Sequence, residues 1–134
     1  MINKSLRQEL RRRFRHDQEL SWGNNTEEAK QYYKENETWL KSVIAELGWP
    51  SEEKVGVVGE QDAWLIAQHA EDIIFQKECL RLLKDLPETK ERMTSVAYLL
   101  DRILTKESKK QIYGTQFQEN GEPYPMEDEK EVDQ

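Results

Sequence analysis

Apolar residues recur at intervals of three or four along most of this chain, and this spacing constrains its fold more than any other feature. The first stripe runs through Ile2, Leu6, Leu10 and Phe14. Because an α-helix has about 3.6 residues per turn, residues at this spacing share one face of a helix. The stripe therefore predicts a first helix over about residues 3–20.

A second stripe predicts a helix that begins after Asn25 and ends before Gly48. Asn25 followed by Glu28 resembles a capping box, and Gly48 with Pro50 terminates the helix. The members of this stripe are Ala29, Tyr33, Asn36, Leu40, Val43 and Leu47. The residues that follow, 49–59, contain two glycines and are predicted to form a loop.

The octapeptide AWLIAQHA, residues 63–70, is apolar on nearly every side of a helix. A helix that is apolar all round is buried all round, so this segment is the predicted central helix. It is expected to continue, with a bend near residues 71–72, as far as Pro87. A last helix is expected to begin near Glu88 or, by preference, with Thr94 as its N-cap.

The pattern changes after Ser108. Residues 111–118, QIYGTQFQ, alternate as a strand does, and Asn120-Gly121 favours a tight hairpin turn. The sequence therefore predicts a mainly α protein: a single helical domain of four or five helices, residues 1–118, with a short C-terminal β-hairpin-like arm. Residues 119–134 are expected to form an acidic, loosely ordered tail.

Charge and composition restrict the partners. The chain has 134 residues, with 20 Lys and Arg against 27 Asp and Glu, a formal net charge of −7. The basic residues of the first helix do not alternate with aromatic residues, so the sequence does not favour nucleic-acid binding. No apolar run approaches the roughly 20 residues of a membrane span, and no secretory signal is visible, which predicts a cytoplasmic protein.

A single cysteine, Cys79, excludes an internal disulfide.

Several polar residues stand at positions that the spacing assigns to apolar faces. Asp17 lies seven residues after Leu10, and Asn36 occupies a stripe position of the second predicted helix. His69 lies in the helix predicted to be the most buried, and Asp101 shares a face of the last predicted helix with Tyr98 and Thr105. Burying such groups without partners costs a few kcal/mol each, so they are expected to pair with one another, with backbone or with a ligand.

A set of short motifs resembles a known family. GWP at 48–50, AWLIAQHA at 63–70, AYLLDR at 97–102, QIYGTQ at 111–116 and PMED at 125–128 occur in the order and nearly the spacing of an uncharacterised bacterial family, domain of unknown function 6624. The resemblance covers most of the chain. The resemblance implies no known activity. It does imply that the positions that recur in the family are the polar residues that helical spacing places on apolar faces.

These observations leave three functions open: a module that binds a small molecule or peptide in a polar pocket under the arm, an interaction or immunity-type protein with a structural polar core, or an enzyme with His69 as general acid or base. His69 and Asp101 are the catalytic candidates. The ligand-binding candidates are Asp17, Asn36, Gln68, His69, Asp101, Arg102, Gln111, Tyr113, Thr115 and Gln116. No metal site is predicted, because the spacing of known metal motifs is missing. The cofactor, the partner and the oligomeric state stay open.

Overall fold

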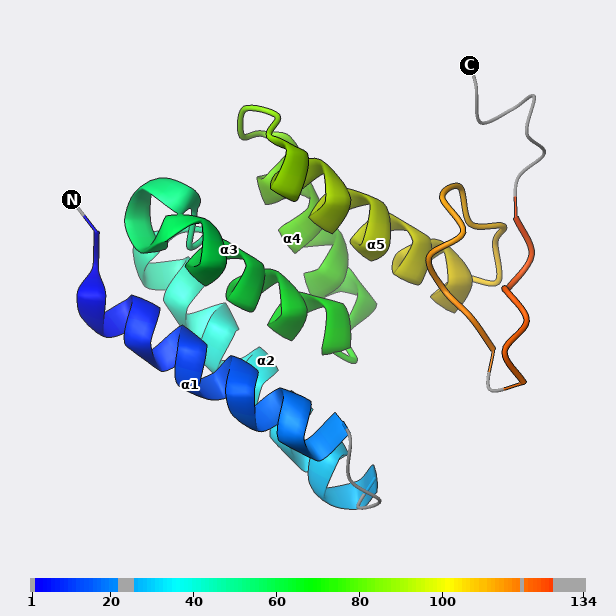
Figure 1. The fold of residues 1–134 in the computed structure, drawn as a ribbon, viewed down its shortest axis with the longest axis horizontal. Coiled ribbons are helices and arrows are strands. Elements are labelled where there is room, and N and C mark those ends of the chain that lie inside the picture. The colour runs from blue at the N-terminus through cyan, green and yellow to red at the C-terminus, as the bar shows by residue number, and fades with distance from the viewer. Residues whose placement is uncertain (1, 22–25, 119, 127–134) are drawn as a thin grey trace. The chain divides into compact units, whose positions relative to one another are not determined.

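The computed structural model describes residues 2–21, 26–118 and 120–126. The described residues are mainly α and contain no strand. Their five helices are α1 (Lys4–Ser21), α2 (Thr26–Leu47), α3 (Glu52–His69), α4 (Ile73–Lys84) and α5 (Lys90–Lys106) (Figure 1). Asn25, the predicted cap of the second helix, lies outside the described residues, as does most of the predicted acidic tail.

The chain divides into two compact units, Met1–Phe75 and Gln76–Gln134. The boundary falls within α4, and each unit is described by itself. That residues 1–118 act as a single domain stays a prediction.

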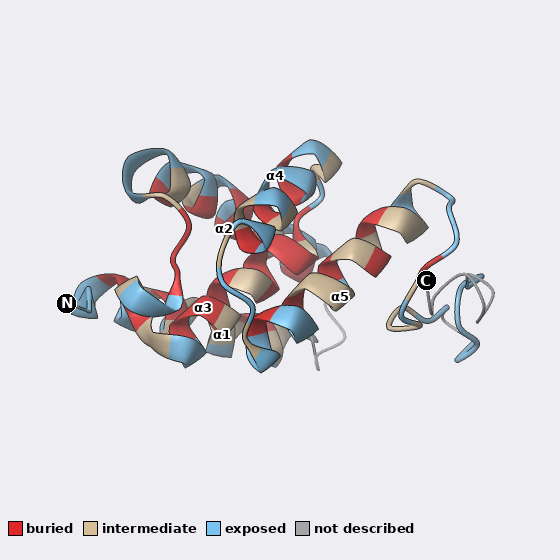
Figure 2. Cartoon of the chain, turned by 90° about the horizontal axis from the view of Figure 1, so that it is seen from above, coloured by how far each residue is buried: buried red, intermediate tan, exposed pale blue. Residues whose placement is uncertain are grey.

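In the first unit, α1 packs against α2 and α3, and α2 packs against α3. The buried apolar residues of this unit include Leu6 and Leu10 of α1, Leu40 of α2 and Ile66 of α3. Figure 2 colours the buried residues of the helices red. The predicted stripes of the first two helices are confirmed in their central parts, whereas Ile2 and Leu47 at their ends are exposed.

Helix α3 is buried on nearly every side between Gly59 and Gln68, as AWLIAQHA predicts. Ile66 is buried and Trp64 is half-buried. The predicted loop over residues 49–59 is wrong from residue 52 onward, because α3 already begins at Glu52. Gly56, with φ of 81° and ψ of 168°, interrupts the helical geometry there. Glycine adopts this backbone conformation without a steric penalty, so it kinks the helix and does not end it.

Helices α3 and α4 are separate rather than one bent helix. Asp72 stands between them, and its Oδ1 accepts hydrogen bonds from the backbone N–H groups of Ile74 at 2.9 Å and Phe75 at 3.3 Å. A side-chain oxygen in this position satisfies N–H groups at the first turn of a helix, which otherwise lack partners.

In the second unit, α4 and α5 run antiparallel, because two contacts join the start of α4 to the end of α5. Lys77 Nζ lies 2.6 Å from Glu107 Oε2, and Lys106 Nζ donates to Gln76 Oε1 at 2.7 Å. Helix α5 begins earlier than the preferred prediction. Thr89 is its N-cap and accepts from the Arg92 N–H. The prediction of Thr94 as N-cap is wrong, since its hydroxyl donates to the Lys90 carbonyl within the helix.

The residues after α5 form a segment without helix or strand, here called the C-terminal segment (residues 111–118 and 120–126). It has two isolated bridges, a parallel one between Gln111 and Met126 and an antiparallel one between Phe117 and Pro123. These bridges do not make a sheet, so the β-hairpin-like arm stays a prediction.

Candidate functional site

The ten candidate residues are divided between the two units. Asp17, Asn36, Gln68 and His69 belong to the first unit, and Asp101, Arg102, Gln111, Tyr113, Thr115 and Gln116 belong to the second. Whether the two groups act together stays a prediction.

In the first unit, Asp17 of α1 and His69 of α3 form a close pair. His69 Nδ1 lies 2.7 Å from Asp17 Oδ2, and the Asp17 side chain is 1% exposed whereas that of His69 is 20% exposed. The His69 ring also packs against the Tyr33 ring of α2, with 4.6 Å between centroids. A carboxylate that accepts the Nδ1 proton fixes the tautomer of the imidazole and turns Nε2 into the acceptor.

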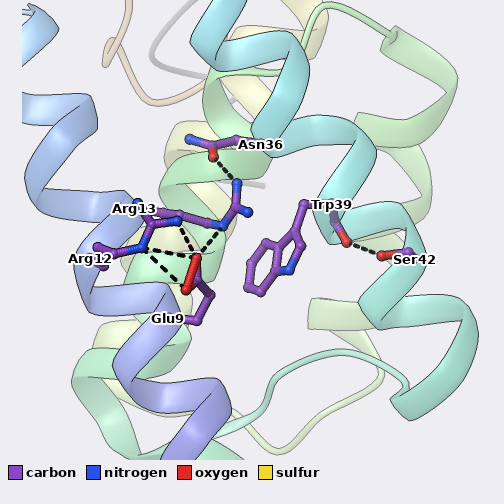
Figure 3. A network of polar contacts seen from close by, with 6 residues as sticks. All are labelled: Glu9, Arg12, Arg13, Asn36, Trp39 and Ser42. Carbon is purple, nitrogen blue, oxygen red and sulfur yellow. Dashed lines mark hydrogen bonds and ion pairs between the residues drawn. The ribbon is translucent and has the colours of Figure 1, made fainter.

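Asn36 belongs to a second polar network, which Figure 3 shows. Arg13 of α1 donates through Nη1 to Asn36 Oδ1 at 2.6 Å and through Nε to Glu9 Oε1 at 3.0 Å. Its guanidinium carbon lies 4.3 Å from the centroid of the Trp39 ring, within the range of a cation–π contact. The hydrogen bond from Arg12, with a smaller contribution from Arg13, lowers the pKa of the Glu9 carboxyl.

Two buried polar atoms next to this network have no hydrogen-bond partner within the described part of the chain, the Tyr32 hydroxyl and the Asn36 Nδ2. Burial raises the pKa of the Tyr32 hydroxyl more than the nearby charges of Arg13 and Arg12, with a smaller contribution from Asn36, lower it. Gln68, the fourth candidate of this unit, is 5% exposed. These residues are consistent with a network that fixes the helices in register.

Sequence reasoning missed Asp62 in α3. Its carboxylate accepts two hydrogen bonds from Arg11 of α1, and its side chain is 2% exposed. Burial raises the pKa of the Asp62 carboxyl more than the hydrogen bond from Arg11 lowers it. Counting would have found this residue, because Asp62 stands four positions before Ile66 on an apolar face.

In the second unit, the Asp101 carboxylate binds backbone N–H groups of the C-terminal segment. It accepts from Ile112 at 2.7 Å, from Tyr113 at 3.0 Å and from Thr115 at 3.1 Å, and also from the Thr115 hydroxyl at 2.9 Å. Asp101 has no exposed surface. Gly114, with φ of 73°, allows the chain to turn around this carboxylate.

Gln111 closes the same segment on itself. Its Nε2 donates to the carbonyl groups of Gln116 and Tyr124, both at 2.9 Å, and its Oε1 accepts from the Gln116 N–H at 2.9 Å. Gln111 is fully buried. Arg102 Nη1 lies 3.5 Å from Gln116 Oε1, at the limit of a hydrogen bond. The polar side chains of QIYGTQ therefore bond mainly to their own segment and to Asp101.

Tyr113 differs from its neighbours, because its side chain is 55% exposed and lines a cavity of about 290 Å³. The cavity lies within the second unit, where α4 ends and α5 begins. Its apolar lining consists of Leu83, Leu86, Met93 and Val96, and its charged lining consists of Lys84, Glu88 and Arg92. The Arg92 guanidinium donates to the Pro87 carbonyl and so holds the loop that forms one side of the cavity.

The described residues give no sign of a metal centre or a membrane helix. No group of three or more His, Cys, Asp or Glu side chains that could hold a metal ion is found among them. None of the helices in the described ranges combines the length and apolar character needed to cross a bilayer.

Residues 9–131 match the family described as "Family of unknown function (DUF6624)", domain of unknown function 6624. The chain belongs to this family, as its motifs indicate. Comparison with curated proteins found no match, and neither did comparison with solved structures.

Proposed function

We propose that the protein is a binding module whose ligand enters the cavity beside Tyr113. One observation carries the proposal: the C-terminal segment uses its polar groups to hold itself, and it leaves an aromatic side chain at a cavity. Both carboxylate oxygens of Asp101 accept the Tyr113 N–H, at 3.0 and 3.2 Å. The backbone under the Tyr113 ring is therefore fixed before a ligand arrives, which lowers the entropic cost of binding.

The lining of the cavity suits a small ligand with an apolar body. Its volume of about 290 Å³ lies just below the range of roughly 300–1,000 Å³ that is typical of small-molecule sites. The affinity comes from burying the apolar surface of the ligand against Leu83, Leu86 and Val96, away from water. In this proposal Asp101, Gln111 and Thr115 position Tyr113 and do not contact the ligand themselves.

Methionine methyl groups provide the test. The chain has three methionines, and Met93 lines the cavity. In a screen of small apolar and aromatic compounds against methyl-labelled protein, ligands are expected to shift the Met93 resonance. Tyr113→Ala should weaken these ligands by tenfold or more, as for a central aromatic contact. Phe117→Ala is the matched control, since Phe117 is 60% exposed on the same segment but does not line the cavity. Equal effects of the two substitutions, or no shift of Met93, would contradict the proposal.

The Asp17–His69 pair supports a second candidate, an enzyme that uses His69 as a general base. The carboxylate would hold the Nδ1 proton and keep Nε2 ready to accept one, as in other Asp–His pairs. The 20% exposure of His69 leaves it reachable from solvent.

The two histidines of the chain allow a direct test of this second candidate. Nitrogen-15 NMR should find the proton of neutral His69 on Nδ1. Asp17→Asn should slow the acylation of His69 by diethyl pyrocarbonate and leave that of His16 unchanged. A proton on Nε2, or an equal effect on both histidines, would exclude His69 as the base.

A further inference from the structure

The rim of the cavity carries charges of both signs that do not pair with each other. Lys84 and Glu88 both line the cavity. Among the residues that the structure describes, neither side chain forms an ion pair or a hydrogen bond. The two residues are four apart, the spacing at which opposite charges pair on a helix.

Lys84 and Glu88 do not pair because the helix ends between them. Helix α4 ends at Lys84, and Pro87 stands between the two residues, where it prevents the helix from continuing to Glu88. Elsewhere in the protein such close pairs do form: Arg81 of α4 contacts Glu78 at 2.5 Å and Asp85 at 3.3 Å. The third charged residue of the lining, Arg92, donates to the Pro87 carbonyl. The end of α4 therefore leaves one cation, Lys84, and one anion, Glu88, at the same opening without a partner among the described residues.

From this juxtaposition we infer that the ligand is a small apolar amino acid or a compound of that type, with one ammonium and one carboxylate group at the end of an apolar body. The inference rests on the proposed binding function and adds the ligand class. The carboxylate binds Lys84, the ammonium binds Glu88, and the side chain of the ligand lies against Tyr113 and Met93.

Size agrees with this ligand class. A volume of about 290 Å³ suits a small ligand, since small-molecule sites typically hold roughly 300–1,000 Å³. An aromatic or long aliphatic amino acid has this size. An aromatic body also gains from contacts with the Tyr113 ring and the Met93 sulfur.

The experiment compares three probes by calorimetry on the full chain: L-phenylalanine, 3-phenylpropanoate, which lacks the ammonium group, and 2-phenylethylamine, which lacks the carboxylate. Phenylalanine is expected to bind about three- to tenfold more tightly than either analogue, the effect of one added charged hydrogen bond at a partly exposed rim.

Substitutions assign the two charges. Lys84→Met should weaken phenylalanine and 3-phenylpropanoate by about the same factor and leave 2-phenylethylamine unchanged, and Glu88→Gln should do the converse. Lys90→Met removes an equivalent positive charge from the first turn of α5, outside the cavity, and should leave all three affinities unchanged.

The outcomes separate this inference from the proposed function. If the three probes bind equally and Tyr113→Ala weakens all of them, the cavity is a binding site but the ligand class is wrong. If none of the probes binds and no compound in the broader screen shifts Met93, both proposals fail. If Lys84→Met and Lys90→Met have equal effects, the contribution of Lys84 is a long-range one and the inference is overturned.

Discussion

Asp17 in the first unit and Asp101 in the second are both buried carboxylates on α-helices, but their partners are of different kinds. Asp17 contacts a side chain on another helix, His69 Nδ1 at 2.7 Å. Asp101 accepts backbone N–H groups from a segment that has no regular structure of its own. The first arrangement links the side chains of two helices, and the second links the C-terminal segment to α5 through its backbone.

The two units also differ in what they expose. The exposed aromatic side chains among the described residues, Tyr98, Tyr113, Phe117 and Tyr124, all belong to the second unit. In the first unit, the aromatic residues Tyr33 and Trp39 pack against His69 and Arg13. Exposed aromatic side chains on a shaped segment are typical of binding surfaces. This contrast favours the second unit as the place where a ligand binds.

The largest expected loss of stability comes from removing the hydrogen bonds of Asp101 to the C-terminal segment. Asp101→Ala removes the acceptor of three backbone N–H groups and one hydroxyl, and should lower the free energy of unfolding by about 3–5 kcal/mol, since buried donors are left without partners. The measurement is denaturant unfolding, with hydrogen exchange of residues 112–115. Asp85→Ala, which removes a 68% exposed carboxylate of the same unit, is the control and should change stability little. Slow exchange at residues 112–115 in Asp101→Ala would show that the carboxylate does not hold the segment.

Removing the buried carboxylate of the first unit is expected to lower the free energy of unfolding by less. Asp17→Ala should lower the free energy of unfolding by about 1–3 kcal/mol, because the main loss is a side-chain partner that can turn toward solvent. Chemical unfolding measures the effect, and Glu19→Ala, an exposed acid on the same helix, is the matched control. An unfolding midpoint that is the same in Asp17→Ala and the wild type would refute a structural role for the pair.

These two carboxylates also mark how far the sequence can be interpreted. Helical periodicity predicted that Asp17 and Asn36 would face inward, because the position of a residue on a helix follows from counting. It could not predict the partners of Asp101, because these are backbone N–H groups. Every residue except proline has one, so the sequence does not indicate which of them bind the carboxylate. The polar side chains of QIYGTQ suggested a polar ligand pocket under the arm, but Gln111 and Thr115 bond within the segment and to Asp101.

The prediction of a loop over residues 49–59 failed for a related reason. Glycine at 56 and 59 indicated a loop, and Gly56 does leave the helical conformation. Gly59 instead lies within α3 and is buried. Its position permits close packing, since an added Cβ would come within 2.8 Å of the Val55 side chain. Glycine thus interrupts the helical geometry at one position and permits close packing within the helix at the other, and the sequence does not distinguish the two.

A pair of matched glycine substitutions sharpens the comparison further. Gly48 ends α2 with φ of 79°, and Gly114 turns the C-terminal segment with φ of 73°. Alanine at either position should lower the free energy of unfolding by about 1–2 kcal/mol, because L-residues are strained in this region. Only Gly114→Ala should also weaken ligands of the cavity, because it disturbs the backbone next to Tyr113. Thermal unfolding and the Met93 shift measure the two effects. Equal loss of binding in both variants would mean that binding follows global stability alone.

The smallest expected effect concerns the Tyr113 hydroxyl, and it decides between a structural clamp and a binding residue. If the segment only clamps the helix end, the hydroxyl should have a buried partner, and Tyr113→Phe should cost about 0.5–1.5 kcal/mol. In the part of the chain that the structure describes, that hydroxyl has no hydrogen bond, and the side chain is 55% exposed. Tyr113→Phe is therefore expected to change the free energy of unfolding by less than about 0.5 kcal/mol.

Thr115→Val provides the comparison within the same turn. It removes a hydroxyl that donates to Asp101 Oδ2 at 2.9 Å, and it should cost about 1 kcal/mol. Denaturant unfolding of the two variants side by side separates the roles, because the changes are similar in size and two positions apart. If Tyr113→Phe destabilises the protein as much as Thr115→Val does, Tyr113 is part of the clamp. The cavity would then lose the residue that most distinguishes it as a binding site.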